Sequence, residues 1–313
     1  MISKEKIALL AMQRYSWEQG TAMQAFLEAG DMDIVIPMAY EAVYRCASDG
    51  RVAQMGNDVA ATDPCSTGEA ILAAYQKTGD KTLEEGLERL TDWALSKAPR
   101  SEQGIVYHLI EEPEFWSDSF YMLPPFLAAI GEYEESLKQI YGYLDALMDE
   151  KTHLISHRWN EKDKKFIRKA FWGTGNGWAL AGIARVIDAL PDTYGDKKDK
   201  LVGIAGTILD SVLGYLREDG LFHDVLDDPS SFIETNCSQM AAYTIYRGVA
   251  SGWLSDQYLD KANKMRNAAA GKTDIYGRVH DVCGAPYFES SGDSPEANAF
   301  AVLMNAAAEK CGL

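Results

Sequence analysis

The chain has 313 residues, of which 47% are hydrophobic and 25% charged, and its formal net charge is −17. A chain of this length and composition can bury a large core, so we expect a globular protein of one large or two modest domains. The acidic excess would repel a phosphate backbone, and no basic cluster with interleaved aromatic residues offsets it. We therefore expect no nucleic-acid partner.

Membrane insertion and disulfide bonding are not indicated either. Gly, Pro and charged residues interrupt every apolar stretch, whereas a membrane-spanning helix needs roughly 20 apolar residues. The N-terminal stretch has only a short apolar run, from Ile7 to Met12, with no cleavage site after it. The five cysteines are scattered and contain no CxxC pair, which argues against a disulfide framework and a zinc site. These features predict a cytoplasmic protein with reduced thiols and no membrane segment.

Helical periodicity runs through most of the chain, and strand signals are few and short. Residues 67–80 and 83–97, for example, read as two amphipathic helices. Turns of Gly followed by an acid stand between such helices at 30–31, 79–80 and 131–132, about fifty residues apart. Glycine suits a helix C-cap, and the acid suits the next N-terminus. Weaker versions at 194–196 and 251–256 extend the pattern, which predicts one domain of helical hairpins.

A string of helical hairpins can form an open solenoid or a closed toroid. The segments that connect these hairpins are long and rich in Trp, His, Asp and Gly. Such segments are typical of loops that crowd the mouth of a barrel. We therefore expect a closed, all-α toroid with its chemistry in the connecting segments.

The segment EEPEFWSDSFYMLPPFLAAIG, residues 111–131, is the most informative. A helix is predicted to open near Asp118, and the Pro-Pro pair at 124–125 is predicted to interrupt or bend it. Asp118 or the serine before it could simply cap this helix. Alternatively, Asp118 lies beside Trp116 and Tyr121, as carboxylates in sugar sites lie beside aromatic rings, and partial burial would suit it to proton transfer.

The glycine-rich segment FWGTGNGW, residues 171–178, is not expected to begin as an ordinary helix, although an apolar helix follows it. It lacks the Lys-Ser/Thr of a P-loop and no strand precedes it, so a nucleotide site is only weakly indicated. Its backbone amides could meet another anion. Trp172 and Trp178 are suited to stacking on a sugar ring, although either one alone could equally pack a barrel interior.

His157 and Trp159 form a further candidate pair, because an imidazole can hydrogen-bond a sugar hydroxyl or a catalytic carboxylate. A lone histidine is, however, more often structural. His153 and His157 are four residues apart but lack an HExxH pattern and an obvious third ligand, so we expect no bound metal.

Asp63 is the candidate carboxylate partner of Asp118. It precedes a proline and a helix that Ser66 or Thr67 is expected to cap, so an acid here is also a plausible turn residue. Asp58 is the competing choice. Farther along, residues 231 and 234 have the spacing of a capping box at the start of another helix, which we interpret as structural.

Taken together, these segments resemble the unsaturated glucuronyl and rhamnogalacturonyl hydrolases of glycoside hydrolase family 105, relatives of family 88. The resemblance runs from WEQG at 17–20, through WSDSFYM, SHRW and WGTGNGW, to GDSPEANAF at 292–300. It implies an (α/α)6 six-hairpin barrel in which residues 1–313 form a single catalytic domain. It also implies a glycosidase that needs no cofactor and acts as a monomer or homodimer.

In that family the Asp of the WxDxxYM motif, here Asp118, protonates the C4=C5 double bond of a terminal unsaturated uronic acid and activates the water that adds at C5. The resemblance thus implies a cytoplasmic hydrolase, EC 3.2.1.-, that acts on pectin-type or glycosaminoglycan-type oligosaccharides. Asp63 would be the helper acid, and His157 would touch the sugar or orient the acid. The other expected binding residues are Trp116, Tyr121, Trp159, Trp172, Thr174 and Trp178.

Thr174 departs from the family pattern, which often has an Arg at this position to bind polar groups of the substrate. Threonine lacks the charge and the bidentate fork of Arg. The substrate carboxylate would then meet glycine-rich backbone amides, Arg158 or Arg14, and the preference between galacturonyl and glucuronyl sugars stays open. Two alternatives remain: a catalytically silent carbohydrate-binding protein on this barrel, and a sugar epimerase that uses paired histidines.

Overall fold

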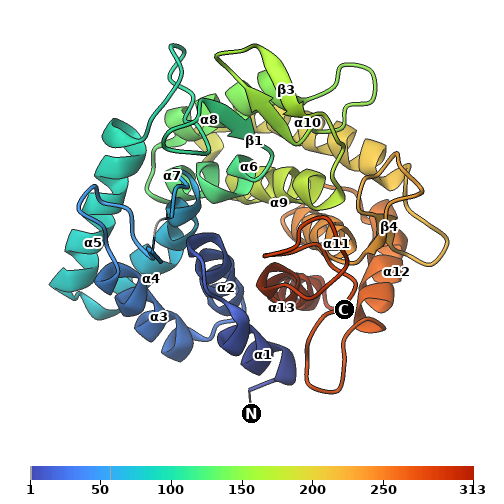
Figure 1. The fold of residues 1–313 in the computed structure, drawn as a ribbon. Helices are drawn as coiled ribbons and strands as arrows, with labels where there is room; N and C mark the ends of the chain where they lie inside the picture. The colour runs from blue at the N-terminus through green and yellow to red at the C-terminus, as the bar shows by residue number, and fades with distance from the viewer. Residues whose placement is uncertain (1, 57) are drawn as a thin grey trace. The chain divides into compact units, whose positions relative to one another are not determined.

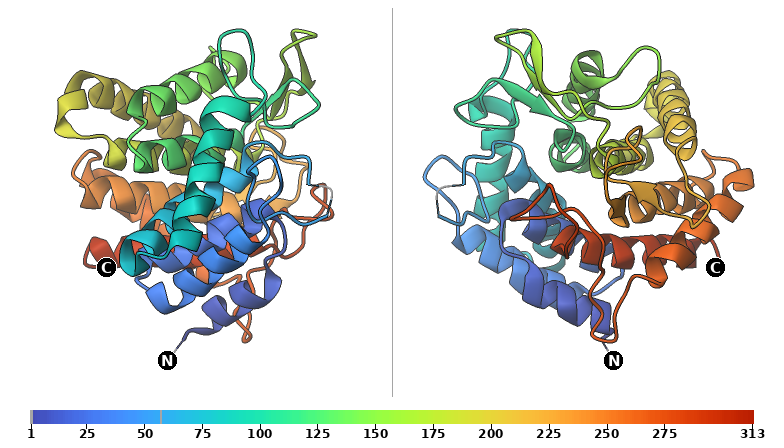
Figure 2. Two further views of the ribbon diagram at one scale, coloured as in Figure 1. Left: turned by 90° about the vertical axis from the view of Figure 1, so that its left-hand side faces the viewer. Right: turned by 45° about the vertical axis from the view of Figure 1, so that its right-hand side comes forward.

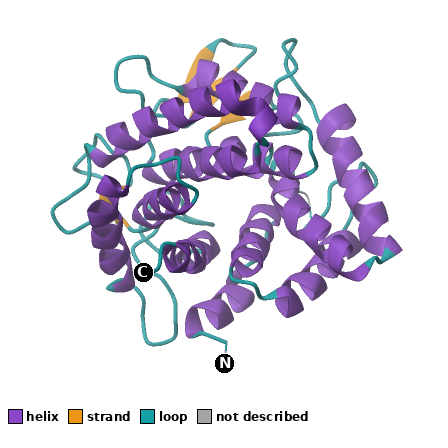
Figure 3. Ribbon diagram, turned by 180° about the vertical axis from the view of Figure 1, so that it is seen from behind, coloured by secondary structure: helices purple, strands orange, loops and turns teal. Residues whose placement is uncertain are grey.

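A computed structural model of the chain describes residues 2–56 and 58–313. Within them, helices dominate and the strands form two small sheets (Figure 3). Contacts divide the chain into two compact units. The N-terminal unit consists of Gln13–Leu147 and Arg158–Lys169, and the C-terminal unit of the chain up to Met12, Met148–His157 and Ala170–Leu313.

The N-terminal unit is built from helical hairpins (Figures 1 and 2). Its helices are α2 (Ser16–Glu28), α3 (Met32–Tyr44), α4 (Gly68–Thr78), α5 (Lys81–Asp92), α6 (Ser119–Met122), α7 (Pro124–Ala129) and α8 (Tyr133–Leu147). A 3-10 turn (Asp63–Thr67) precedes α4, and a π-helical turn (Trp93–Lys97) follows α5. The strands β1 (Glu114–Trp116), β2 (Arg158–Asn160) and β3 (Lys165–Arg168) form one antiparallel sheet.

The glycine-acid turns predicted between these helices are confirmed. Gly30, Gly79 and Gly131 adopt φ values of 77°, 66° and 87°, a left-handed conformation that glycine reaches without steric cost. Asp80 then caps α5, because its carboxylate accepts a hydrogen bond from the backbone N–H of Thr82 at 2.7 Å.

The C-terminal unit packs α11 against both α9 and α13 (Figure 1). Its helices are α1 (Lys4–Met12), α9 (Gly173–Ala189), α10 (Gly195–Leu213), α11 (Asn236–Ala250), α12 (Leu259–Ala270) and α13 (Pro295–Lys310). Short 3-10 turns (Asp192–Tyr194 and Asp256–Tyr258) precede α10 and α12, and strands β4 (Phe222–His223) and β5 (Ile233–Glu234) form a hairpin. The weaker glycine turn is confirmed at Gly252, whose φ is 75°, but Gly195 lies at the start of α10 with φ −41°.

The expectation that the glycine-rich segment 171–178 would not begin as a helix is wrong. Helix α9 begins at Gly173 and continues through the remaining glycines. A Cβ atom on Gly177 would lie 2.3 Å from the Sδ of Met240 in α11, and one on Gly173 would lie 3.3 Å from the Cβ of Cys237. The glycines therefore permit close packing of α9 on α11, and this packing outweighs their low helix propensity.

Two predicted helix caps are also wrong. Neither Ser66 nor Thr67 caps α4, because their hydroxyls donate instead to the backbone oxygens of Asp63 and of the following proline. Helix α11 begins at Asn236, so residue 231 lies too far upstream to cap it. Glu234 lies in β5 and still receives hydrogen bonds from the first backbone N–H groups of α11.

None of the helices within the described residues has the length and apolar character needed to cross a membrane. All five cysteines are free thiols, as the sequence predicts.

Candidate active site

Asp118 stands at the junction between strand β1 and helix α6. Its backbone is helical and it precedes the first residue of α6, but its side chain makes no hydrogen bond that caps the helix. The hydroxyl of Ser117 donates to Asp118 Oδ2 at 3.2 Å. Helix α6 ends at Met122, and the Pro-Pro pair starts α7, as predicted. The half-buried Asp118 carboxylate is thus held at a helix start without being used as its cap.

The side chain of His108 lies behind this junction and was not recognised from the sequence as a site residue. Its Nδ1 is 2.9 Å from the hydroxyl of Thr62 and 3.1 Å from that of Ser119. Its Nε2 is 3.8 Å from Asp63 Oδ1. Burial, together with the positive charge of Arg158, lowers the pKa of His108 to about 3. The imidazole is therefore neutral at pH 7, so its contact with Asp63 is not an ion pair.

Trp116 is fixed between a histidine ring and a cation. The ring of His108 stacks on it with centroids 4.4 Å apart, and the guanidinium carbon of Arg158 lies 4.2 Å from its ring centroid. Buried Glu114 joins Trp116 to Arg158, since its Oε2 accepts hydrogen bonds from Trp116 Nε1 at 2.8 Å and from Arg158 Nη2 at 2.8 Å. The pairing of β1 with β2 places Trp116 opposite Arg158 and so explains this cluster.

The structure separates the two candidates for the helper acid. Asp63 is buried in the 3-10 turn and faces His108. Asp58 instead accepts hydrogen bonds from the hydroxyl of Ser16, 42 residues away, at 2.8 Å and from the backbone N–H of Ala60 at 2.9 Å. Asp63 is thus the candidate that faces His108, and its partnership with Asp118 stays a prediction.

Trp159 and Tyr121 are less closely tied to this cluster. Trp159 pairs with Phe115 rather than with Trp116, and its Nε1 donates to Glu161 at 2.9 Å. Tyr121 is fully buried. Trp159 thus makes a hydrogen bond within its own sheet region, and Tyr121 lies in the core. Contact of either side chain with a substrate stays a prediction.

In the C-terminal unit, His157 and Trp172 come together. Their ring centroids are 4.7 Å apart, with planes tilted by 41°. The indole Nε1 of Trp172 donates to Oδ1 of Asp224 at 3.0 Å. Asp224 was not identified from the sequence, because it is brought to Trp172 by the β4–β5 hairpin.

The other two predicted residues of this segment lie inside α9. Trp178 is 2% exposed and packs edge-on against Phe300, with centroids 5.5 Å apart. Thr174 is 3% exposed, and its buried hydroxyl oxygen has no hydrogen-bond partner among the described residues. Both side chains thus belong to the packed face of the helix.

Glu234 is a second carboxyl near Asp224, and it is fully buried. It accepts hydrogen bonds from the backbone N–H groups of Asn236 at 2.8 Å and Cys237 at 2.7 Å. Burial raises the pKa of Glu234 to about 8, and the negative charge of Asp224 adds to this effect against the backbone hydrogen bonds. Glu234 therefore carries a proton at neutral pH.

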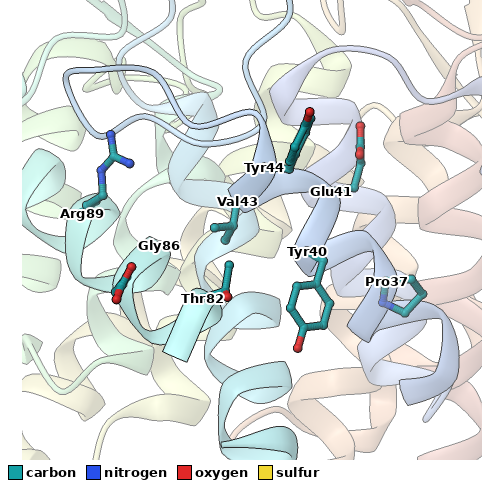
Figure 4. A pocket seen from close by; sticks show the side chains of 9 residues that line it. Pro37, Tyr40, Glu41, Val43, Tyr44, Thr82, Gly86 and Arg89 are labelled. Carbon is teal, nitrogen blue, oxygen red and sulfur yellow. The ribbon is translucent and has the colours of Figure 1, made fainter. Parts of the chain in front are cut away.

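The described residues include no metal-binding cluster, and a groove between α3 and α5 lies apart from the candidate site residues. Within residues 2–56 and 58–313, no group of three His, Cys, Asp or Glu side chains is placed to hold a metal ion. A groove of about 610 Å³ opens between α3 and α5 (Figure 4). Its lining residues are Pro37, Tyr40, Glu41, Val43, Tyr44, Thr82, Glu85, Gly86 and Arg89. None of the predicted site residues, all of which the structure describes, lines this groove.

Comparison with known proteins shows the family. Residues 2–293 match the model of Glycosyl Hydrolase Family 88. The unsaturated rhamnogalacturonyl hydrolase YesR of Bacillus subtilis (strain 168) is 30% identical over 213 residues, which cover 63% of this chain and 60% of that protein. The chain thus spans less than two thirds of this curated relative.

Solved structures show the fold. A possible family 105 member from Klebsiella pneumoniae superposes with a TM-score of 0.83 at 21% identity, over 95% of this chain and 83% of that one. A family 105 glycoside hydrolase from C. acetobutylicum gives 0.81 at 19% identity, over 95% and 94%. The all-α, (α/α)6 six-hairpin fold class is thereby confirmed, as is the resemblance to families 105 and 88. The chain belongs to Glycosyl Hydrolase Family 88.

Proposed function

We propose that the protein is a glycosidase that removes a terminal 4,5-unsaturated uronic acid from an oligosaccharide by hydrating the C4=C5 double bond. The observation that carries this proposal is the half-buried carboxylate of Asp118, which does not cap its helix. It stands between Trp116 and Ser119 in the sequence, and both of these contact His108. The relatives, which are named as unsaturated rhamnogalacturonyl or 3S-rhamnoglycuronyl hydrolases, support the same reaction.

In this reaction, Asp118 in its acid form donates a proton to C4, and positive charge develops at C5 and the ring oxygen. Water then adds at C5 and returns a proton to the Asp118 carboxylate, so the acid is regenerated. The resulting hemiketal opens and releases the rest of the oligosaccharide. Asp63, held beside the neutral His108, is proposed to stabilise the positive charge and orient the water.

Arg158 is the best-supported ligand for the sugar carboxylate. Its Nε and Nη2 bind Glu114 at 3.1 and 2.8 Å, and this leaves Nη1 for a substrate oxygen. Arg14 is less suitable, because its Nη1 donates to the adjacent Gln13 carbonyl at 2.8 Å. The buried Thr174 hydroxyl cannot replace a guanidinium.

Aromatic residues are proposed to bind the sugar ring, with His157 and Trp172 acting together. The remaining proposed binding residues are Trp116, Tyr121, Trp159, Thr174 and Trp178. The substrate proposed is a pectin-type or glycosaminoglycan-type fragment. The named hydrolases among the relatives do not favour a silent binding protein or an epimerase.

Both units are proposed to belong to one catalytic domain over residues 1–313, since the family match runs continuously through both of them. A cytoplasmic location is supported by the five free thiols, of which Cys65, Cys237 and Cys283 are buried. A monomer or homodimer remains our prediction.

The test measures the ultraviolet absorbance of unsaturated uronates in a panel of lyase-generated disaccharides. Native protein is expected to bleach at least one of them, and Asp118→Asn is expected to be slower by about 10²–10⁴-fold. The control Asp163→Asn changes a half-exposed acid of the β2–β3 turn and is expected to behave as native protein. If no disaccharide responds, the reaction is wrong; if Asp118→Asn matches native protein, the acid is misassigned.

A further inference from the structure

Asp224 joins the β4–β5 hairpin to the start of α9 through both its side chain and its backbone. The buried carboxylate accepts from Trp172 Nε1 at 3.0 Å. The backbone oxygen of Asp224 accepts from the N–H of Gly173 at 2.6 Å, and its backbone N–H donates to Phe232 at 2.8 Å. One residue therefore fixes both the indole of Trp172 and the first residue of the helix.

Backbone contacts also fix the segment that carries the indole. Trp172 forms an isolated β-bridge with Val225, and the N–H of Leu226 donates to the carbonyl of Phe171 at 2.9 Å. Only 5% of Trp172 is exposed, so a sugar can reach little of its ring directly. His157, which is half-buried, rests on this ring at 4.7 Å and is the more accessible member of the pair.

The side chains around Asp224 are neutral. Glu234 lies on the neighbouring strand, where it pairs with Phe222, and burial raises its pKa to about 8. Burial also raises the thiol pKa values of Cys237 and Cys283 well above the usual range, so these groups stay neutral. Asp224 therefore lies beside neutral side chains here, and the geometry shows its Oδ1 accepting the indole N–H.

We propose that Asp224 is a positioning residue, which fixes the Trp172 indole as the surface that supports His157 and thereby sets how tightly the site binds the sugar. Asp224 takes no part in proton transfer in this scheme. The inference rests on the proposed function, because it assigns His157 and Trp172 to sugar binding.

The test compares three variants in steady-state kinetics. Asp224→Ala removes the acceptor and is expected to raise KM about tenfold, while kcat stays within about twofold of native protein. Asp224→Asn keeps an oxygen that can accept the indole N–H, so it is expected to restore most of the affinity. The control Asp228→Ala lies in the same hairpin and removes a side chain that bonds to Ser230; it is expected to match native protein.

A second measurement detects the hydrogen bond between Trp172 and Asp224 without an activity assay. The indole N–H resonance of Trp172, assigned with Trp172→Phe, is expected to shift in Asp224→Ala, because the hydrogen bond is lost. In a double-mutant cycle, adding Asp224→Ala to Trp172→Phe is expected to leave KM unchanged, since the N–H is already absent. If Asp224→Ala fails to fold, Asp224→Leu, which also removes the acceptor, replaces it in the kinetics and in the cycle.

Three results would overturn the proposal: an unchanged KM in folded Asp224→Ala, a loss confined to kcat, or additive KM effects in the cycle. A failure of the proposed function looks different. In that case native protein bleaches no unsaturated uronide, whereas the indole resonance still reports whether Asp224 holds Trp172.

Discussion

Two tryptophan clusters, one in each unit, use the same residue types in different electrostatic settings. In the N-terminal unit, the Trp116 indole binds Glu114, which also pairs with Arg158. The side chain of Arg158 is 29% exposed, so this cluster presents a cation to solvent. The charge of its buried carboxylate is balanced within the cluster itself.

In the C-terminal unit, the Trp172 indole binds Asp224, and the neighbouring carboxyl of Glu234 is buried and protonated at neutral pH. The first cluster can therefore attract an ionic substrate, whereas the second holds aromatic rings in place. The comparison teaches that a Trp–acid pair identifies a binding group or a support only once its exposure and its counter-charge are known.

The largest effect is expected from replacing the proposed helper acid, Asp63. Asp63→Asn is expected to lower kcat/KM by about 10²–10³-fold, because it removes the charge proposed to stabilise the developing cation. Asp58→Asn is expected to stay within about twofold, since the Asp58 carboxylate binds Ser16 and the backbone of Ala60, neither of which is a proposed site residue. The measurement is kcat/KM of both variants on the disaccharide that native protein cleaves. A larger loss in Asp58→Asn than in Asp63→Asn would assign the helper role to Asp58.

The pH dependence of stability tests the buried carboxyl of the second cluster. The pKa of Glu234 is about 8 in the folded protein, against 4.5 as its ordinary value. Between these values the folded chain binds the extra proton, so the contribution of Glu234 to the free energy of unfolding falls as pH rises from about 4.5 to about 8. Relative to Glu234→Gln, native protein is expected to lose up to about 5 kcal/mol over this window, at about 1.4 kcal/mol per pH unit.

Urea unfolding at a series of pH values measures this difference. Glu218→Gln, which changes an exposed acid of the same unit, serves as the control and is expected to retain the native pH dependence. A constant difference between native protein and Glu234→Gln across the window would show that Glu234 is ionised in the folded state.

Replacement of the exposed cation tests the first cluster. Arg158→Lys keeps the charge but loses the planar fork and its stacking on Trp116, so KM for an acidic disaccharide is expected to rise about tenfold. Arg168→Lys, on the neighbouring strand β3, is the matched control and is expected to have little effect. An equal rise in KM for the methyl ester of the substrate would contradict carboxylate binding by Arg158.

The smallest effects concern α9, the helix that follows Trp172. Gly177→Ala is expected to reduce the free energy of unfolding by about 1 kcal/mol, because its Cβ would lie 2.3 Å from Met240 Sδ. Gly203→Ala in α10 meets no atom within 4 Å and is expected to stabilise the protein by about 0.5–1 kcal/mol. Urea unfolding compares the two, and similar effects would show that Gly177 is not needed for close packing.

Local sequence patterns predicted much of the fold and singled out Asp118 as the candidate acid. Periodicity and glycine-acid spacing predicted the hairpins, because these signals arise within a few residues. The motif around Asp118 likewise lies in one short segment. The start of α9 was predicted wrongly because glycines lower the local helix propensity, whereas close packing on Met240, far along the chain, favours a residue without a Cβ at 177.

The missed residues depend on contacts between distant segments. His108 became recognisable only through its hydrogen bond to Thr62, 46 residues away, and Asp224 through its bond to Trp172, 52 residues away. Nothing local to either residue distinguishes it from other polar residues in a loop. Likewise, Glu234 pairs with Phe222 in a strand, so it does not occupy the third helical position that a capping box requires.

The most direct test of the central claim follows the reaction in D2O by NMR with an unsaturated disaccharide as substrate. Hydration of the C4=C5 bond predicts that native protein places one deuterium at C4 of the released sugar, with a single stereochemistry, and that Asp118→Asn slows this incorporation. Release of the sugar with its C4=C5 bond intact and without deuterium at C4 would show displacement at the anomeric carbon and contradict the account.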